Sequence, residues 1–262
     1  RTITRRYTDK AVEFITANKD NPFFLYLPHS MPHIPLYVPE DVYDPDPKNA
    51  YTCVIEHIDA EVGRLVQTVR DLGIADNTYI IYTSDNGPWL QFGSHGGSAL
   101  PLRSGKGTTF EGGQRVPCVM WAPGRIPAGT TTDAFTSTLD LLPTIASLTK
   151  SKLSANKIDG KDISSTLTSD RSPRKDMLFY SARGELQGIR EGDWKLLEIT
   201  QVNRKNKSSK TTSYLFNLAN DIGEQNNLFT QNPERVARMK IQMQRLDAEI
   251  TENARSVWRK PK

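Results

Sequence analysis

A chain of 262 residues is long enough to bury one sizeable core and to carry a smaller appended subdomain. Hydrophobic residues make up 37% and charged residues 24%, which is typical of folded globular proteins and disfavours the disordered and membrane classes. No apolar run approaches the ~20 residues that cross a bilayer. The net charge of +4 suits an anionic substrate. A nucleic-acid binder normally carries a basic stripe with base-stacking aromatic residues, which this sequence lacks.

The two cysteines, Cys53 and Cys118, do not have the spacing of metal ligands. We expect two buried structural thiols, and the sequence leaves a disulfide between them open. The chain begins with Arg1 rather than methionine and shows no signal peptide. We therefore expect it to begin inside a longer precursor or after processing.

In chain order, the first predicted element is a helix over Asp9–Asn18. Phe23–Leu27 (FFLYL) follows as an almost wholly apolar strand, the pattern of a parallel strand buried on both faces. It leads into residues 28–35, where three prolines stiffen a loop that carries His29 and His33. Such a loop can hold a histidine in one orientation.

A long amphipathic helix is predicted over Tyr51–Leu72, because apolar residues recur there at helical spacing and a glycine follows. Tyr79–Thr83 (YIIYT) then predicts a short strand that ends in the turn residues Ser84–Gly87. Ligands usually bind at the carboxyl ends of strands in α/β sheets. Asp85 and Asn86 place two oxygen ligands side by side there, as Ca²⁺ or Mg²⁺ requires.

Two cations follow on a flexible turn, Arg103–Gly107 (RSGKG), whose Lys106 is flanked by glycines. A carboxylate–amide pair followed by such a lysine suggests a metal site that also holds an anion. Trp89 and His95 lie in the glycine-rich loop between the two motifs. They either help to choose a substrate or belong to a loop that packs on itself.

After Lys175 the pattern changes to short antiparallel strands, and a closing amphipathic helix is predicted over Pro233–Thr251. The basic polar run Asn203–Thr212 is predicted to be a solvated hairpin tip. Binding of a sulfated polymer is the alternative for this run.

These motifs, in this order, resemble the formylglycine-dependent sulfatases, which are arylsulfatase-like members of the alkaline phosphatase superfamily. The resemblance rests on SDNG at Ser84–Gly87 and on LRSGKGTTFEGG at Leu102–Gly113. MPHIPL at Met31–Leu36 and DLLPT at Asp140–Thr144 agree as well. The motifs are in the family's order and cover nearly the whole chain.

The resemblance implies an alkaline phosphatase-like α/β fold. We expect Phe23–Leu27, Tyr79–Thr83 and Val116–Trp121 to lie in one mixed, mainly parallel sheet flanked by helices. A small C-terminal antiparallel sheet with a helix should follow. The corresponding domains are residues 1–170, the C-terminal portion of the α/β catalytic domain, and residues 171–262, an α+β subdomain.

The resemblance also implies roles for individual residues. Asp85 and Asn86 are expected to bind Ca²⁺, Lys106 to contact the sulfate, and His33 to contact the sulfate and the leaving oxygen. His95 and Arg103 are further candidates for substrate binding. His29 is expected to be structural or to lie behind the site, and Asp140 to be structural.

The implied activity is hydrolysis of sulfate monoesters with Ca²⁺ and a formylglycine nucleophile. The family makes formylglycine from a cysteine in Cys-X-Pro-Ser-Arg, and neither cysteine here lies in that motif. We expect the nucleophile in a missing N-terminal half of the same protein, and this chain alone to be inactive. The expected substrate is a sulfated small molecule or glycan, with no nucleic-acid partner and no membrane span. A secreted, periplasmic or lysosomal location is expected.

Two alternatives remain open from the sequence. A phosphate or phosphonate monoester hydrolase of the same superfamily would share the metal-binding pair, although the His33 loop and the Lys106 motif favour a sulfatase. A non-catalytic protein that binds sulfated ligands would lack the nucleophile altogether.

Overall fold

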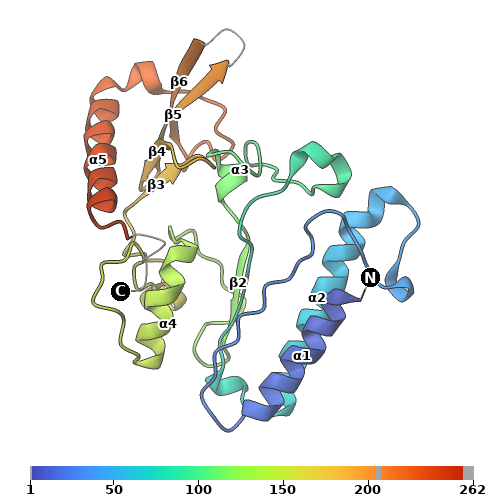
Figure 1. Cartoon of the computed structure of the whole chain (residues 1–262). Coiled ribbons are helices and arrows are strands. Elements are labelled where there is room, and N and C mark those ends of the chain that lie inside the picture. Colours follow the sequence, from blue (N-terminus) through green and yellow to red (C-terminus); the bar gives the residue numbers. More distant parts are fainter. Residues whose placement is uncertain (1, 204–207, 256–262) are drawn as a thin grey trace, which may run out of the picture. The chain divides into compact units, whose positions relative to one another are not determined.

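The structure is a computed structural model that describes residues 2–203 and 208–255. The chain forms two compact units, which are shown in Figure 1 and described one at a time below. Unit 1 comprises Arg1–Ala99, Ser104–Lys106 and Arg115–Gly129, and unit 2 comprises Leu100–Arg103, Gly107–Gln114 and Thr130–Lys262. The predicted boundary after residue 170 falls inside unit 2, and the division into domains stays a prediction. None of the helices in the described ranges is long and apolar enough to span a membrane.

Two long helices, α1 (Ile3–Asn18) and α2 (Ala50–Asp71), lie side by side in unit 1 (Figure 1). The buried residues of α2 recur at helical spacing, so one stripe faces the core. Val54 and Ile58 on this stripe pack with Val38 from the loop that follows His33. This contact holds the histidine-bearing loop against α2.

A two-stranded sheet completes unit 1. β1 (Ile80–Thr83) and β2 (Cys118–Trp121) pair antiparallel, with Ile81 opposite Met120. The two cysteines are free thiols; Cys53 is half-buried and Cys118 is exposed, so the expectation of two buried thiols is wrong for Cys118.

The prediction of a strand at Phe23–Leu27 is wrong. This segment is extended, but it belongs to no sheet among the described residues. Both sheets in this part of the chain are antiparallel, so the mainly parallel sheet is not present in it. The physical reason is that an extended segment becomes a strand only when a neighbour accepts and donates its backbone hydrogen bonds. Its side chains nevertheless alternate like those of a strand: Phe23, Leu25 and Leu27 are half-buried, whereas the two between them are exposed.

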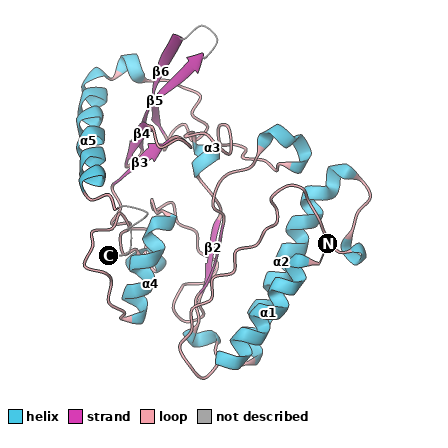
Figure 2. Ribbon diagram, viewed as in Figure 1, coloured by secondary structure: helices cyan, strands magenta, loops and turns pink. Residues whose placement is uncertain are grey.

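Unit 2 is built on an antiparallel sheet, which confirms the predicted C-terminal sheet (Figure 2). Its four strands are hydrogen-bonded in the order of the sequence, with Leu196 opposite Leu215 in the longest pairing. The strands are β3 (Asp176–Tyr180), β4 (Leu186–Glu191), β5 (Trp194–Asn203) and β6 (Ser208–Asn217). The run Asn203–Thr212, predicted as a hairpin tip, is described only in part: its residues from Ser208 onward belong to β6 and pair with β5, whereas residues 204–207 lie outside the described residues.

Both faces of this sheet are covered. On one face lies α5 (Pro233–Glu252), as Figure 1 shows. Its side chains Val236, Met239 and Met243 pack against the strands. The opposite face carries Phe179, Leu197 and Phe216, which pack with the aromatic ring of Phe110. Phe110 immediately precedes α3 (Glu111–Gln114), so the segment after Lys106 is fixed to the sheet.

The remaining helix of unit 2, α4 (Leu141–Thr149), begins at a buried ion pair. The carboxylate of Asp140 accepts hydrogen bonds from Nε and Nη2 of Arg174 and also from the Ser137 backbone nitrogen, the last at 2.9 Å. Asp140 is fully buried. These contacts agree with the structural role expected for it.

Shorter elements connect the main ones. They are 3₁₀ helices at Glu40–Val42, Pro47–Asn49, Ala75–Asn77, Leu90–His95, Thr138–Asp140, Ser164–Leu167 and Phe229–Gln231.

Candidate functional site

The turn after β1 carries the predicted metal ligands. Asp85 is exposed and Asn86 is half-buried. The Ser84 hydroxyl donates to the Asn86 carbonyl oxygen at 3.0 Å, which tightens the turn. The Asn86 side-chain nitrogen donates to the Gly87 carbonyl oxygen at 3.2 Å, so its side-chain oxygen is the atom that can face a cation.

Lys106 is attached to the same turn by its backbone. Its amide nitrogen donates to the Pro88 carbonyl oxygen at 2.9 Å. A β-carbon on the preceding residue, Gly105, would lie 2.4 Å from that same oxygen, so this close approach requires glycine. The Lys106 ammonium lies 5.0 Å from the centre of the Trp89 ring, at cation–π distance.

His33 is oriented by its own loop. Its Nδ1 lies 2.7 Å from the Ile34 carbonyl oxygen. A carbonyl oxygen can only accept, so Nδ1 carries the hydrogen and Nε2 is the nitrogen available for chemistry. The imidazole ring lies 5.5 Å from the Trp89 ring, centre to centre.

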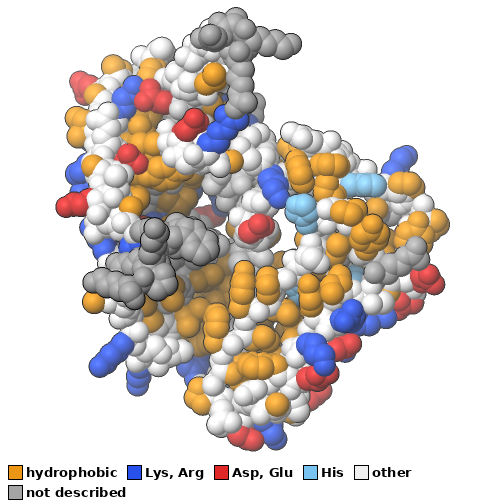
Figure 3. Space-filling model, viewed as in Figure 1, with side chains coloured by type: hydrophobic (Ala, Val, Ile, Leu, Met, Phe, Trp, Pro, Cys, Tyr) orange, Lys and Arg blue, Asp and Glu red, His pale blue; other side chains and the backbone are white. Residues whose placement is uncertain are grey.

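Trp89 is therefore the common contact of the two predicted catalytic side chains. His33 and Lys106 both touch its indole, and the turn with Asp85 and Asn86 leads directly into it. Phe92 packs edge-on against the same ring at 4.8 Å. Figure 3 shows histidine and hydrophobic side chains gathered together on the face of unit 1 that it presents. The structure thus gathers these segments, and the chemical role of each residue stays a prediction.

The two further substrate-binding candidates are held by other contacts. His95 Nε2 lies 2.9 Å from the Pro47 carbonyl oxygen, which ties its loop to the start of α2. In unit 2, the Arg103 guanidinium lies 4.1 Å from the Phe110 ring centre and donates to the Glu224 carbonyl oxygen at 2.8 Å. Their proposed contact with substrate stays a prediction.

A buried charge cluster in unit 2 was missed by sequence reasoning. The Lys195 ammonium is fully buried and lies 2.8 Å from a Glu111 oxygen and 3.0 Å from a Glu224 oxygen. Burial raises the pKa of Glu224, and the Lys195 charge opposes this shift. One signal was available: Lys195 interrupts the apolar run Trp194–Leu197, and a charge inside a covered sheet needs partners.

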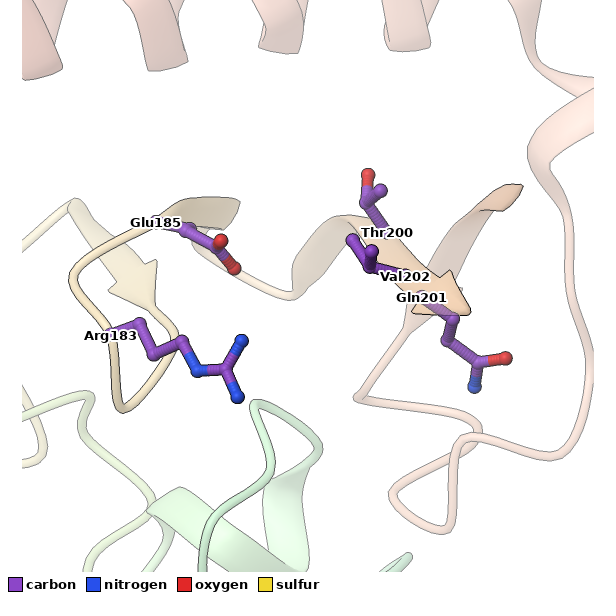
Figure 4. Close-up of a pocket in the computed structure, with 5 residues that line it drawn as sticks. All are labelled: Arg183, Glu185, Thr200, Gln201 and Val202. Carbon is purple, nitrogen blue, oxygen red and sulfur yellow. The ribbon is translucent and has the colours of Figure 1, made fainter. Parts of the chain in front are cut away.

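An open pocket of about 500 Å³ lies elsewhere in unit 2 (Figure 4). Its lining residues come from β5 and from the turn before β4; they are Arg183, Glu185, Thr200, Gln201 and Val202. It contains none of the predicted site residues.

No cluster of three or more histidine, cysteine or acidic side chains suited to a metal ion occurs in the ranges 2–203 and 208–255. Asp85 with Asn86 offers oxygen donors of the kind that Ca²⁺ prefers. Two such residues supply only part of the six to eight oxygens in a calcium site.

Comparison with known proteins gives a consistent family assignment. The chain is 35% identical over 254 residues to human arylsulfatase A, covering 88% of this chain and 50% of that protein. It is 33% identical over 217 residues to mouse N-acetylgalactosamine-6-sulfatase, covering 81% of this chain and 41% of that protein. The chain spans about half the length of the curated relatives it matches.

Solved structures agree. The fold matches Ps i-CgsB, crystallised in complex with k-i-k-neocarrahexaose, at a TM-score of 0.81 and 32% identity, covering 98% of this chain and 56% of that one. It matches the PsFucS1 sulfatase from Pseudoalteromonas sp. at a TM-score of 0.85 and 25% identity, covering 97% and 54%. A phosphonate monoester hydrolase from Silicibacter pomeroyi shares the fold more distantly, with a TM-score of 0.54 and 20% identity. The family model named Sulfatase matches residues 1–151, more than half of the chain, and the chain therefore belongs to the sulfatase family.

Proposed function

We propose that this chain carries part of the active site of a sulfuric ester hydrolase that cleaves sulfate monoesters. The observation that carries the proposal is the shared contact of His33 and Lys106 with Trp89, next to the Asp85–Asn86 turn. A histidine, a fixed cation and two oxygen ligands are the groups needed to bind a sulfate and to protonate a leaving oxygen.

In the proposed site, the Lys106 ammonium neutralises charge on the sulfate oxygens. His33 is held by its Nδ1 hydrogen bond so that Nε2, when protonated, can donate to the leaving oxygen. Asp85 and Asn86 would hold Ca²⁺, which when bound further screens the sulfate charge. His95 and Arg103 are proposed to contact the rest of the substrate.

The formylglycine nucleophile is proposed to lie in a further segment of the same protein, because Cys-X-Pro-Ser-Arg does not occur in this chain. The remaining calcium ligands are proposed to lie in that segment as well. The names of the relatives, an arylsulfatase and an N-acetylgalactosamine-6-sulfatase, support a sulfated small molecule or glycan as substrate. A secreted, periplasmic or lysosomal location is proposed with it.

A phosphonate or phosphate monoesterase is the alternative, and the fold shared with the Silicibacter pomeroyi enzyme is the observation behind it. The higher identity to sulfatases favours sulfate. A non-catalytic protein that binds sulfated ligands is a further alternative, and it would bind an aryl sulfate without turning it over.

The test uses the full-length precursor, matured by a formylglycine-generating enzyme, with 4-nitrophenyl sulfate and 4-nitrophenyl phosphate as substrates. We expect turnover of the sulfate that is lost on chelation and restored by Ca²⁺. Lys106→Ala and His33→Ala should each lower kcat/KM at least about tenfold, or roughly 1.4 kcal/mol of barrier. Lys152→Ala, at an exposed lysine of unit 2, is the matched control and should leave it unchanged. Faster turnover of the phosphate would favour the alternative.

A further inference from the structure

The segment that carries Lys106 is a closed loop. Its two stems meet where the Gly112 backbone nitrogen donates to the Arg103 carbonyl oxygen at 2.8 Å. Lys106 lies between these residues in the sequence, in the part of the loop that belongs to unit 1. The stems themselves belong to unit 2. Whatever fixes the stems therefore limits where the loop can place its lysine.

One residue, Glu224, bonds to both stems. Its backbone carbonyl oxygen accepts from the Arg103 guanidinium at 2.8 Å. Its carboxylate Oε2 accepts from the Glu111 backbone nitrogen at 2.7 Å. Glu224 also adopts a positive φ of 53°, which is uncommon for a residue other than glycine. This conformation presents both its carbonyl and its carboxylate to the loop.

The second carboxylate oxygen of Glu224 is held in turn by Lys195. The two atoms lie 3.0 Å apart, and Lys195 also bonds Glu111 at 2.8 Å. Lys195 and Glu224 are both fully buried, and the ammonium lies 4.7 Å from the Phe179 ring centre. With Phe110 packed against the same face of the sheet, the C-terminal stem is fixed by charge and by apolar contact together.

We infer that Glu224 is a positioning residue for Lys106: it anchors both stems of the Arg103–Gly112 loop to the C-terminal sheet. The inference rests on the proposed role of Lys106 in binding sulfate.

Two substitutions at Glu224 separate its anchoring of the Arg103–Gly112 loop from its contribution to the stability of the fold. Glu224→Ala removes both carboxylate contacts. Glu224→Gln cannot satisfy both, because its amide presents one acceptor and one donor where the Glu111 nitrogen and the Lys195 ammonium both need acceptors. In the glutamine variant the Lys195 ammonium still pairs with the Glu111 carboxylate, so the buried lysine keeps a partner of opposite charge. We therefore expect this variant to fold. Asp140→Asn, which breaks the buried pair with Arg174 in the same unit, is the matched control.

The experiment is a double-mutant cycle on kcat/KM for 4-nitrophenyl sulfate in the matured full-length protein. We expect Glu224→Ala to lower kcat/KM about tenfold and Glu224→Gln by less. Neither should have a further effect in the Lys106→Ala background, since the lysine they position is then absent. Asp140→Asn should have the same effect, if any, in both backgrounds. Equal effects of the Glu224 variants with and without Lys106 would overturn the inference.

Hydrogen exchange distinguishes this failure from a failure of the proposed function. Amides of residues 104–110 should exchange faster in both Glu224 variants and not in Asp140→Asn. This result does not require turnover. If the wild-type protein fails to hydrolyse aryl sulfates, the proposed function is wrong, and unchanged exchange at 104–110 would overturn the anchoring itself.

Discussion

Two buried histidine nitrogens in unit 1, His29 Nδ1 and His57 Nε2, have no hydrogen-bond partner among the described residues. Both side chains lie near Glu61, which pairs with Arg64 at 2.6 Å and with Arg5 at 3.5 Å. Burial lowers the pKa of each histidine, while the charge of Glu61 opposes the shift. For His57, Arg5 lowers the pKa further and Asp41 raises it.

These shifts predict a loss of stability in mild acid. A histidine in an unfolded chain titrates near pH 6.5, at about its ordinary pKa. As the pH falls below that value, the two histidines become protonated in the unfolded chain before they do so in the folded chain, where their pKa is lower. The free energy of unfolding therefore decreases. The contribution of the two neutral histidines to the free energy of unfolding is complete above about pH 6.5. It is lost as the pH falls toward the lower pKa that each histidine has in the folded chain.

Urea unfolding of the chain between pH 7.5 and 5.5 measures this effect. His57→Gln, which removes one titrating group, should flatten the pH dependence. A His57→Gln profile identical to wild type would show that burial of this ring does not control acid stability.

At the residue scale, the candidate site residues that the sequence could predict are those whose signals are local. Asp85, Asn86 and Lys106 lie in short motifs of turn residues and glycine, and the Gly105 contact with Pro88 explains why the glycine is needed. The contact of His33 with Trp89 and the Glu111–Lys195–Glu224 cluster join residues far apart in the chain. No spacing rule in a single sequence encodes such contacts.

At the scale of elements, Phe23–Leu27 is the segment whose surroundings differ most from its predicted ones. Phe24 is 68% exposed and Tyr26 is 76% exposed, although the segment reads as a strand buried on both faces. Val119 on β2 is 63% exposed as well. Phe24 and Tyr26 lie on the same side of an extended segment, and exposed apolar side chains that cluster in this way usually mark a surface that binds another polypeptide. We propose that the segment with the nucleophile covers them.

Phe24→Ser with Tyr26→Ser tests this reading in the 262-residue chain. Removing exposed rings should change the free energy of unfolding by less than about 0.5 kcal/mol and should reduce self-association in light scattering. Ile58→Ala, in the core of unit 1, should instead cost about 2–5 kcal/mol because it leaves a cavity. A serine pair as destabilising as Ile58→Ala would mean that the rings already pack within the chain.

Helix periodicity was sufficient to predict α2 and α5 almost to their ends, because a long amphipathic helix shows its apolar stripe in the sequence itself. The strands of the C-terminal sheet were also found, since their alternation and the turns between them are local. The strand at Phe23–Leu27 was wrong because strand formation depends on a partner rather than on the segment itself. The pairing direction of β1 and β2 is equally non-local.

At the scale of the whole molecule, the chain supplies an incomplete set of groups for its proposed reaction. The residues proposed as the cation, the histidine and two calcium ligands are present, whereas the Cys-X-Pro-Ser-Arg motif of the proposed nucleophile is not. Lys106 and His33 can only stabilise charge or move a proton once an attack has begun. Calcium bound by Asp85 and Asn86 alone lacks most of its preferred oxygens and should bind weakly.

We therefore predict that the 262-residue chain does not hydrolyse sulfate esters and that the full-length precursor does. The measurement is turnover of 4-nitrophenyl sulfate by both proteins, each produced with a formylglycine-generating enzyme, at saturating Ca²⁺. Calcium titration by calorimetry provides a second readout, because the chain should bind the ion far more weakly than the precursor. Comparable turnover in the two proteins would mean that a nucleophile other than formylglycine lies within these 262 residues. In that event the division of the active site between two segments, on which the roles of Lys106 and His33 depend, would have to be abandoned.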